Sequence, residues 1–176
     1  MLDIGTKPQD DSIRKLYKYM RQEQNKNCGG CCGEIEVDLK NNKNCFSYLL
    51  RAAQFYEYKL SHTPDKACES FFGFNSVLPG AYCLFNWEAI KGGPMDAFFK
   101  LVNRKEPPSC SEANEYLAED RVMCMQIYIK EECGFYLTYV PDAKAITDAP
   151  DSLLVLMKQR RRWMNGAFFA AWRVIN

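Results

Sequence analysis

The chain has 176 residues, and its composition, 47% hydrophobic and 14% aromatic, is that of a protein with a buried core and excludes a disordered protein. Its 23 basic and 22 acidic residues leave a formal net charge of +1, which is not the strongly basic balance of a dedicated nucleic-acid-binding domain, so no nucleic-acid partner is expected. No apolar run approaches the roughly 18–20 residues that cross a bilayer, and the first residues lack the basic and apolar regions of a signal peptide.

Helical and strand patterns alternate along the chain, which favours an α/β sheet with crossover helices. Residues 1–5, "MLDIG", are typical of the end of a buried strand, with Asp3 where the strand becomes a loop. In residues 11–22 the apolar side chains recur at helical spacing after an Asp-Ser start. Further helices are predicted for residues 44–62, 113–131 and 149–163, and extended segments for residues 31–39, 76–87 (with a turn at Pro79-Gly80) and 134–147.

Nine cysteines raise the alternatives of a zinc site and a disulfide framework. Cys28 and Cys31 have the spacing of a ligand pair, but a matching second pair is absent and His62 is the single histidine. An odd count without a signal peptide argues against disulfides. We therefore expect reduced thiols that act as small buried apolar residues in a cytosolic domain, and a surface or capping role for His62.

Two stretches carry acidic residues in arrangements that suit catalysis. In "LDIGT" a strand-end carboxylate, Asp3, precedes a glycine, which suits a divalent metal that bridges a diphosphate, although such an Asp is more often a cap or a turn former. In "YLAEDR" the pair Glu119 and Asp120 lies beside Arg121, an arrangement that can set up a general base or can simply be a solvated helix end.

A third stretch, "KQRRRWMNGAFF", combines cations with an indole ring. Guanidinium groups bind phosphate with two parallel hydrogen bonds, and an indole face stacks on a sugar or a base. By itself the stretch could equally be a solvated basic face or a patch that contacts lipid headgroups.

The order of these stretches carries more information than any one of them. "LDIGTKP", "CCGEI", "QFYEYKLS", "FGFNSVLPGAY", "GGP", "YLAEDR" and "QRRRWMNGAFF" follow one another from Leu2 to about Phe169. This series resembles the catalytic domain of chitin synthases, processive membrane glycosyltransferases of glycosyltransferase family 2. The resemblance implies a GT-A type α/β nucleotide-sugar fold, with residues 1–163 as the C-terminal half of the catalytic domain, built from a mixed sheet and flanking helices. Residues 164–176 would begin an amphipathic helix at the membrane interface.

The resemblance also implies roles for particular residues. Asp3 matches the aspartate that binds a divalent metal, Mg²⁺ or Mn²⁺, and Asp120, with Glu119 beside it, matches the catalytic base. Gln159, Arg162 and Trp163 match the Q-x-x-R-W motif beside the donor diphosphate and the acceptor sugar. The remaining substrate-binding residues that the resemblance implies are Arg161, Phe72, Gly73, Leu78, Pro79 and Gly80.

The implied reaction transfers N-acetylglucosamine from UDP-N-acetylglucosamine to the 4-hydroxyl of a growing β-1,4-linked chitin chain, with inversion. The enzyme would lie in the plasma membrane or in chitin-synthesising vesicles, anchored by segments outside this chain, with its catalytic domain facing the cytoplasm; homo-oligomerisation stays open. The uridine pocket would lie upstream of Met1, so we expect a fragment that is inactive in isolation. A cellulose- or hyaluronan-synthase-like polymerase and a catalytically dead interaction module remain as alternatives, although "VLPGA" and "RRRWMNGAFF" favour chitin.

Overall fold

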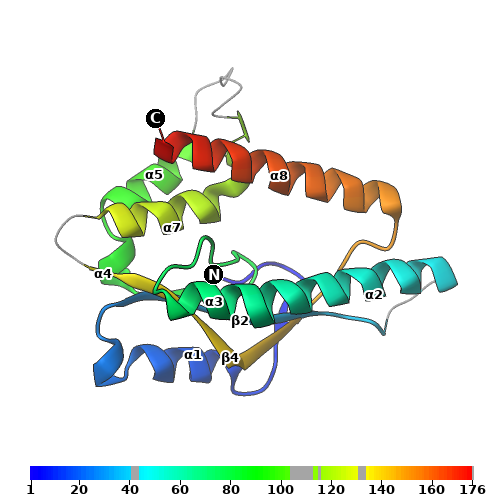
Figure 1. Ribbon diagram of the computed structural model, residues 1–176, viewed down its shortest axis with the longest axis horizontal. Coiled ribbons are helices and arrows are strands. Elements are labelled where there is room, and N and C mark those ends of the chain that lie inside the picture. Colours follow the sequence, from blue (N-terminus) through cyan, green and yellow to red (C-terminus); the bar gives the residue numbers. More distant parts are fainter. Residues whose placement is uncertain (41–43, 104–112, 115, 131–133, 176) are drawn as a thin grey trace.

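A four-stranded mixed sheet lies at the centre of the computed structural model, in the strand order β1-β4-β2-β3 (Figure 1). The structure describes residues 1–40, 44–103, 113–114, 116–130 and 134–175. The long strands β2 and β4 pair in parallel, and the short strands β1 and β3 pair antiparallel at the two edges. The strands span Lys7–Pro8 (β1), Cys28–Val37 (β2), Cys83–Phe85 (β3) and Tyr136–Thr147 (β4).

Helices cover both faces of this sheet, as the predicted α/β fold with a mixed sheet and flanking helices requires. One helix, α1, lies on the side of the sheet opposite to α7 and α8 in Figure 1. The helices span Ser12–Met20 (α1), Cys45–Leu60 (α2), Ala67–Phe71 (α3), Trp87–Ile90 (α4), Gly93–Val102 (α5), Glu119–Ile129 (α7) and Leu153–Ile175 (α8). Short 3-10 helices span Glu23–Asn25 (η1) and Tyr116–Ala118 (η3), and a π-helix spans Ser61–Lys66 (η2).

The strand β2 is buried on both faces, whereas its sequence had suggested a half-exposed alternating strand. Cys31 packs in a cluster with Leu16 of α1, and the next residue, Cys32, packs in a cluster with Cys124 and Ile127 of α7. Successive side chains of a strand point to opposite faces, so helices on both faces bury both sets.

The thiol prediction is confirmed for most of the described cysteines and wrong for two. The described cysteines are free thiols, and the buried ones lie in the sheet and in α7. These buried thiols are Cys28, Cys31, Cys32, Cys83 and Cys124. Cys45 and Cys68 are exposed because they lie on the outer surfaces of α2 and α3. Cys110 and Cys133 lie outside the described residues.

Two further expectations are wrong. Leu2 forms only an isolated antiparallel bridge with Tyr82 and is 51% exposed, so residues 1–5 are not a buried strand end. The surface position expected for His62 is wrong, because it is 4% exposed and lies in the π-helix; the capping alternative agrees with its contacts, since Nδ1 lies 2.8 Å from the backbone oxygen of Tyr58 in the last turn of α2, and the ring stacks on the ring of Tyr58. Burial lowers the pKa of His62, which favours the neutral ring.

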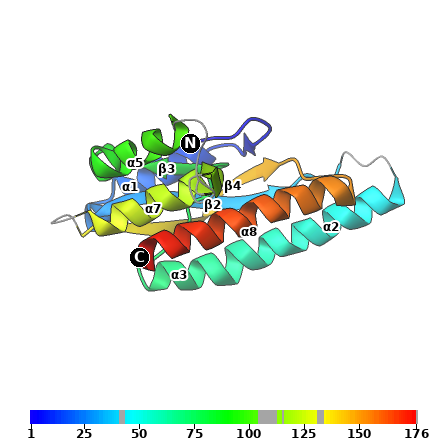
Figure 2. The ribbon, with the colours of Figure 1, turned by 90° about the horizontal axis from the view of Figure 1, so that it is seen from above.

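The helix predicted for residues 44–62 is present and continues through η2 into α3, so that α2, η2 and α3 form one long rod beside α8 (Figure 2). The predicted C-terminal helix begins at Leu153, with the Ser152 hydroxyl accepting from the amide of Val155 at 3.4 Å. It runs without a break past residue 163, and the division into residues 1–163 and 164–176 stays a prediction. Within the described ranges, no helix is long and apolar enough to cross a membrane.

Close contact between β2 and β4 depends on Gly33, beside a register shift in this strand pair. A Cβ atom added at Gly33 would lie 2.1 Å from the backbone oxygen of Ala143 and 2.4 Å from the ring of Tyr82. We therefore expect Gly33→Ala to lower the free energy of unfolding by about 3 kcal/mol, as a lower melting temperature of the purified protein. Gly93→Ala is the matched control, because an added Cβ meets nothing within 4 Å. Equal melting temperatures for the two variants would contradict this packing.

Candidate active site

Backbone pairing holds Asp3 beside the Pro79-Gly80 turn. The amino group of Met1 donates to the backbone oxygen of Cys83 at 2.7 Å, and the amide of Asp3 donates to the backbone oxygen of Ala81 at 3.2 Å. These bonds continue the bridge between residues 2 and 82 as a short antiparallel ladder. Two stretches that are 80 residues apart in the chain, "LDIG" and "LPGA", therefore lie side by side.

The carboxylate of Asp120 lies against the same turn. Its Oδ2 accepts a hydrogen bond from the backbone amide of Gly80 at 3.3 Å, and its Oδ1 accepts one from the amide of Arg121 at 2.7 Å. Asp120 is in the first turn of α7, where the helix dipole favours a negative charge. A side chain at Gly80 would point toward Asp120, since an added Cβ lies 4.0 Å from Oδ2, so glycine leaves space in front of this carboxylate.

The pKa of Glu119, the first residue of α7, depends on the charged groups near it. Burial raises the pKa of Glu119, the carboxylates of Asp120 and Asp3 raise it further, and the guanidinium of Arg162 opposes them. The charged groups that act on Glu119 are thus three predicted catalytic or binding residues, Asp3, Asp120 and Arg162. The structure brings these residues of the prediction together.

Gly166 allows α8 to pack closely against η3, the turn before Asp120. This packing role was not predicted from the sequence. A Cβ atom added at Gly166 would lie 2.8 Å from the Cβ of Ala118 and 3.2 Å from the backbone oxygen of Leu117. Close approach of α8 to η3 therefore requires glycine. Residues four apart share a helix face, so Arg162 faces the start of α7 as Gly166 does. A glycine inside a strongly helical pattern was the available signal.

Trp163 lies in a second group of contacts, between α8 and α2. The guanidinium carbon of Arg160 is 4.2 Å from the centroid of the Trp163 ring, and the ring of Tyr58 is 6.5 Å from it at 53°. Arg160 also forms an ion pair with Glu57, at 2.5 Å between Nη2 and Oε2. Of the three basic residues Lys158, Arg160 and Arg161, some of which were expected to face solvent or lipid headgroups, Arg160 instead has a partner on α2. Lys158 and Arg161 are exposed.

The segment that contains Phe72 and Gly73 lies near the end of α7 that is opposite to Asp120. Phe72 is 75% exposed at the end of α3, and Gly73 turns the chain with φ of +70°. The next residue, Phe74, contacts Tyr128 with ring centroids 4.9 Å apart. Eight residues of helix separate Tyr128 from Asp120, which is roughly 12 Å. A direct contact of Phe72 or Gly73 with the same sugar ring as Asp120 is therefore not supported by this arrangement.

Leu78, one of the predicted substrate-binding residues, lies in the core. Its side chain is fully buried in the cluster with Cys124 and Leu137, and its amide donates to the sulfur of Cys124 at 3.2 Å. Packing against α7 takes this side chain into the core, so it anchors the turn instead of facing a ligand. Pro79 and Gly80, which follow it, are partly exposed and stay candidates for ligand contact.

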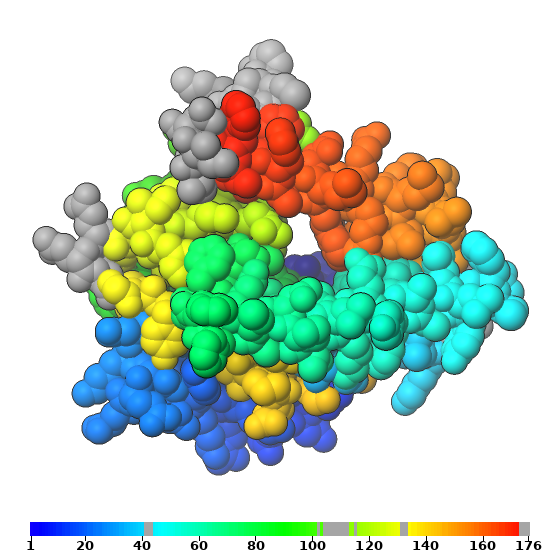
Figure 3. Space-filling model, viewed as in Figure 1, coloured from blue at the N-terminus to red at the C-terminus, as the bar shows by residue number. Residues whose placement is uncertain are grey.

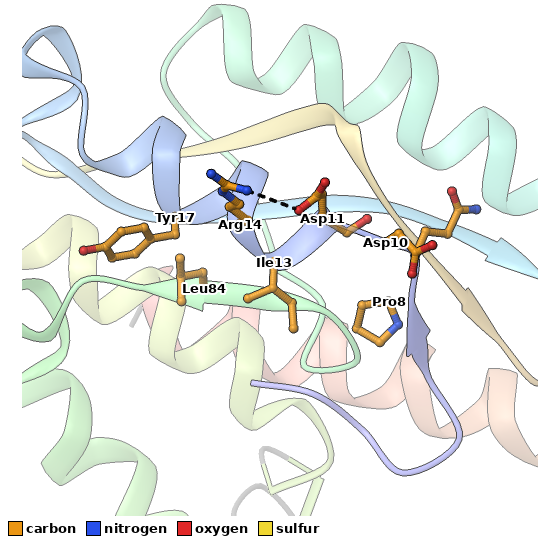
Figure 4. Close-up of a pocket in the computed structure, with 9 residues that line it drawn as sticks. Pro8, Asp10, Asp11, Ile13, Arg14, Tyr17 and Leu84 are labelled. Atoms are coloured by element: carbon orange, nitrogen blue, oxygen red, sulfur yellow. Dashed lines mark ion pairs between the residues drawn. The ribbon is translucent and has the colours of Figure 1, made fainter.

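The space between α8 and the α2–α3 rod is hollowed in the space-filling view, with the dark blue N-terminal segment at its floor (Figure 3). A separate, shallow hollow beside α1 is lined by residues that include Pro8, Ile13 and Leu84, with an ion pair between Arg14 and Asp11 at 3.8 Å on its rim (Figure 4). None of the predicted site residues lines this second hollow, so it is not part of the candidate active site.

The residues at the site fit a divalent metal only in partnership with a phosphate ligand. Asp3 is exposed, and among the described residues no group of three or more acidic, His or Cys side chains is placed to hold a metal. Mg²⁺ commonly binds through one or two carboxylates plus the phosphates of a substrate. Asp3 therefore suits a cation that arrives with a diphosphate, and does not suit a metal cage made by the protein alone.

The charge environment of Glu119 makes a prediction about stability. A carboxyl group whose pKa is raised in the folded state binds its proton more tightly there, so stability falls as pH rises above the ordinary value of 4.5. Glu119→Gln should remove this loss, so the variant should melt at a higher temperature than wild type at pH 7 and at nearly the same temperature at pH 4. A lower melting temperature for the variant at pH 7 would contradict the raised pKa.

Comparison with known proteins identifies the family of the chain. Residues 1–176 match the chitin synthase-like glycosyltransferase domain. The chain is 43% identical to chitin synthase 2 of Mycosarcoma maydis over an alignment of 178 positions that covers 99% of this chain and 16% of that protein. It is 44% identical to chitin synthase C of Aspergillus oryzae (97% of this chain, 19% of that protein) and 41% identical to chitin synthase 1 of Saccharomyces cerevisiae (97% and 15%). The chain therefore belongs to the family of chitin synthase-like glycosyltransferase domains.

Proposed function

We propose that this chain is part of the catalytic domain of a chitin synthase that transfers N-acetylglucosamine from UDP-N-acetylglucosamine to the 4-hydroxyl of a growing β-1,4-linked chain, with inversion. One observation carries the proposal: Asp3 and Asp120 lie at one turn, Pro79-Gly80, and the charge of Arg162 acts on Glu119 beside Asp120, in a member of this family. The chain spans only 15% to 19% of the length of these relatives, so the donor, the acceptor and the membrane are partners of the longer protein.

Asp120 is the group that takes the proton from the attacking hydroxyl. The amides of Gly80 and Arg121 orient its two oxygens. Glu119, whose pKa is raised by burial, shapes the site from beside it. The base is thus fixed by backbone groups before the acceptor arrives, which lowers the cost of orientation.

The donor diphosphate lies between Asp3 and the arginines of α8. Arg162 stabilises the charge that develops on the diphosphate as UDP leaves, with Arg161 and Gln159 near it. Mg²⁺ or Mn²⁺ held at Asp3 would supply further neutralisation of that charge. Trp163 stacks under the terminal sugar of the acceptor and fixes its angle of attack.

The named relatives support chitin over the alternatives. Cellulose- and hyaluronan-type polymerases would share Asp3, Asp120 and the Q-x-x-R-W residues, but the compared proteins bear the name chitin synthase.

Exposed apolar side chains along α8, which include Leu154, Met164 and Phe168, support a helix that rests on a membrane surface. We place the catalytic domain on the cytoplasmic side of the plasma membrane or of chitin-synthesising vesicles, and we propose that the isolated 176-residue chain is inactive because the uridine pocket is supplied by other segments.

Asp120→Asn in the full-length protein tests the base. The change keeps the shape of the side chain and removes the group that accepts a proton, so chitin synthesis should fall by about 10²–10⁴-fold. Binding of UDP should change little, because the proton acceptor is not the phosphate ligand. The measurement is incorporation of labelled N-acetylglucosamine in membranes, with calorimetry for UDP.

Glu119→Gln is the matched control for Asp120→Asn, since it removes the neighbouring carboxylate and keeps the hydrogen bond between Asp120 and Gly80. It should lower synthesis by less than Asp120→Asn does. Wild-type rates for Asp120→Asn would remove Asp120 from the mechanism and with it the proposed function.

Arg162→Lys tests the contact with the leaving group. Lysine keeps the positive charge but lacks the planar fork that binds two phosphate oxygens at once, so we expect turnover to fall about 10-fold or more while the melting temperature is unchanged. Unchanged turnover would assign the phosphate contact to a different cation of α8.

A further inference from the structure

Arg160 is held differently from the neighbouring cations of α8. Its side chain is 21% exposed, whereas Lys158, Arg161 and Arg162 are exposed residues. Its partner, Glu57, is in the last turn of α2, more than 100 residues earlier in the chain. The ion pair between them therefore connects the two helices on either side of the hollow seen in Figure 3.

Arg160 also covers one face of the Trp163 ring. Its guanidinium carbon is 4.2 Å from the ring centroid, a distance at which a cation is attracted to the indole face. Tyr58, the residue after Glu57, contacts the same indole at 6.5 Å with a tilt of 53°. One face of Trp163 is thus in contact with the protein, and the ring remains 39% exposed.

We propose that Arg160 and Glu57 are positioning residues that set the angle of the Trp163 ring, so that its other face receives a sugar of the acceptor. This inference rests on the proposed function, in which Trp163 stacks under the acceptor chain. Arg160 would thus orient Trp163, whereas Arg162 binds the diphosphate, although both arginines belong to the same basic segment of α8.

The charge balance argues against Arg160 as a phosphate ligand. Glu57 already neutralises its guanidinium through a short contact, and phosphate would have to displace this carboxylate. The planar face of the group is occupied by Trp163. A planar cation between a carboxylate and an indole is rigid, which is the property required of a residue that orients an aromatic ring.

Two buried atoms beside Trp163 indicate the chemistry of the ligand. Nη1 of Arg160 and Oε1 of Gln159 are buried, and neither has a hydrogen-bond partner in the part of the chain that the structure describes. Residues three and four apart share a helix face, so both side chains are on the side of α8 that carries Trp163. A buried donor and a buried acceptor are costly without partners. A sugar hydroxyl, which can donate and accept, satisfies either atom.

The experiment uses the full-length protein in membranes, with free N-acetylglucosamine as the acceptor and labelled disaccharide as the product. Arg160→Met keeps the length of the side chain and removes the cation, so the KM for the acceptor should rise about 10-fold. The Kd for UDP in calorimetry should stay within about twofold, because the phosphate contact is made elsewhere. Lys158→Met, an exposed cation two residues away, is the matched control and should leave both values unchanged.

Two more variants separate positioning from folding. Arg160→Lys keeps the charge over the ring and should recover part of the acceptor KM. Glu57→Gln should raise the acceptor KM as Arg160→Met does, and the double variant should be no worse than Arg160→Met, because the two side chains act as a unit. Additive losses, or a UDP Kd that rises with Arg160→Met, would overturn the inference. Wild-type disaccharide synthesis by Trp163→Ala would instead contradict the proposed function, whatever the result at Arg160.

Discussion

The hydrogen bond from the amide of Gly80 to Asp120 joins the parts of the candidate site. Gly80 is in a turn that pairs with residues 1–3, and Asp120 begins a helix whose preceding turn packs under Gly166 of α8. This one contact therefore connects three stretches of sequence that are far apart in the chain. Leu78 makes the connection rigid, because its buried side chain anchors the turn in the core.

Local pattern was sufficient to predict most of the elements. The spacing of Leu16 and Met20, the turn residues Pro79-Gly80 and the long apolar period of α8 each point to one backbone conformation. Burial on both faces of β2 was not predicted, since it depends on which helices cover the sheet. His62 was misplaced for a similar reason: a π-helix, which has no reliable sequence signal, turns it into the core.

The site was predicted in part. The resemblance grouped Asp3, Asp120 and Arg162, and in the structure Asp3 and Asp120 lie at one turn while the charge of Arg162 acts on the neighbouring Glu119. Leu78 and Phe72 were grouped with them because their segment resembles the family's substrate-binding segment, yet one is in the core and the other lies near the opposite end of α7. Glu57 had no signal of its own, because its partner Arg160 is on a helix more than 100 residues away. Contacts between distant helices depend on the packed fold and not on a local motif.

The most direct test of the central claim is a cryo-electron microscopy map of the full-length protein with UDP and Mg²⁺. The account predicts density for the diphosphate between Asp3 and Arg162, with the Asp120 carboxylate still bonded to the amide of Gly80. Nucleotide density in another part of the domain, with Asp3 and Arg162 both away from it, would contradict the claim that these residues form one site.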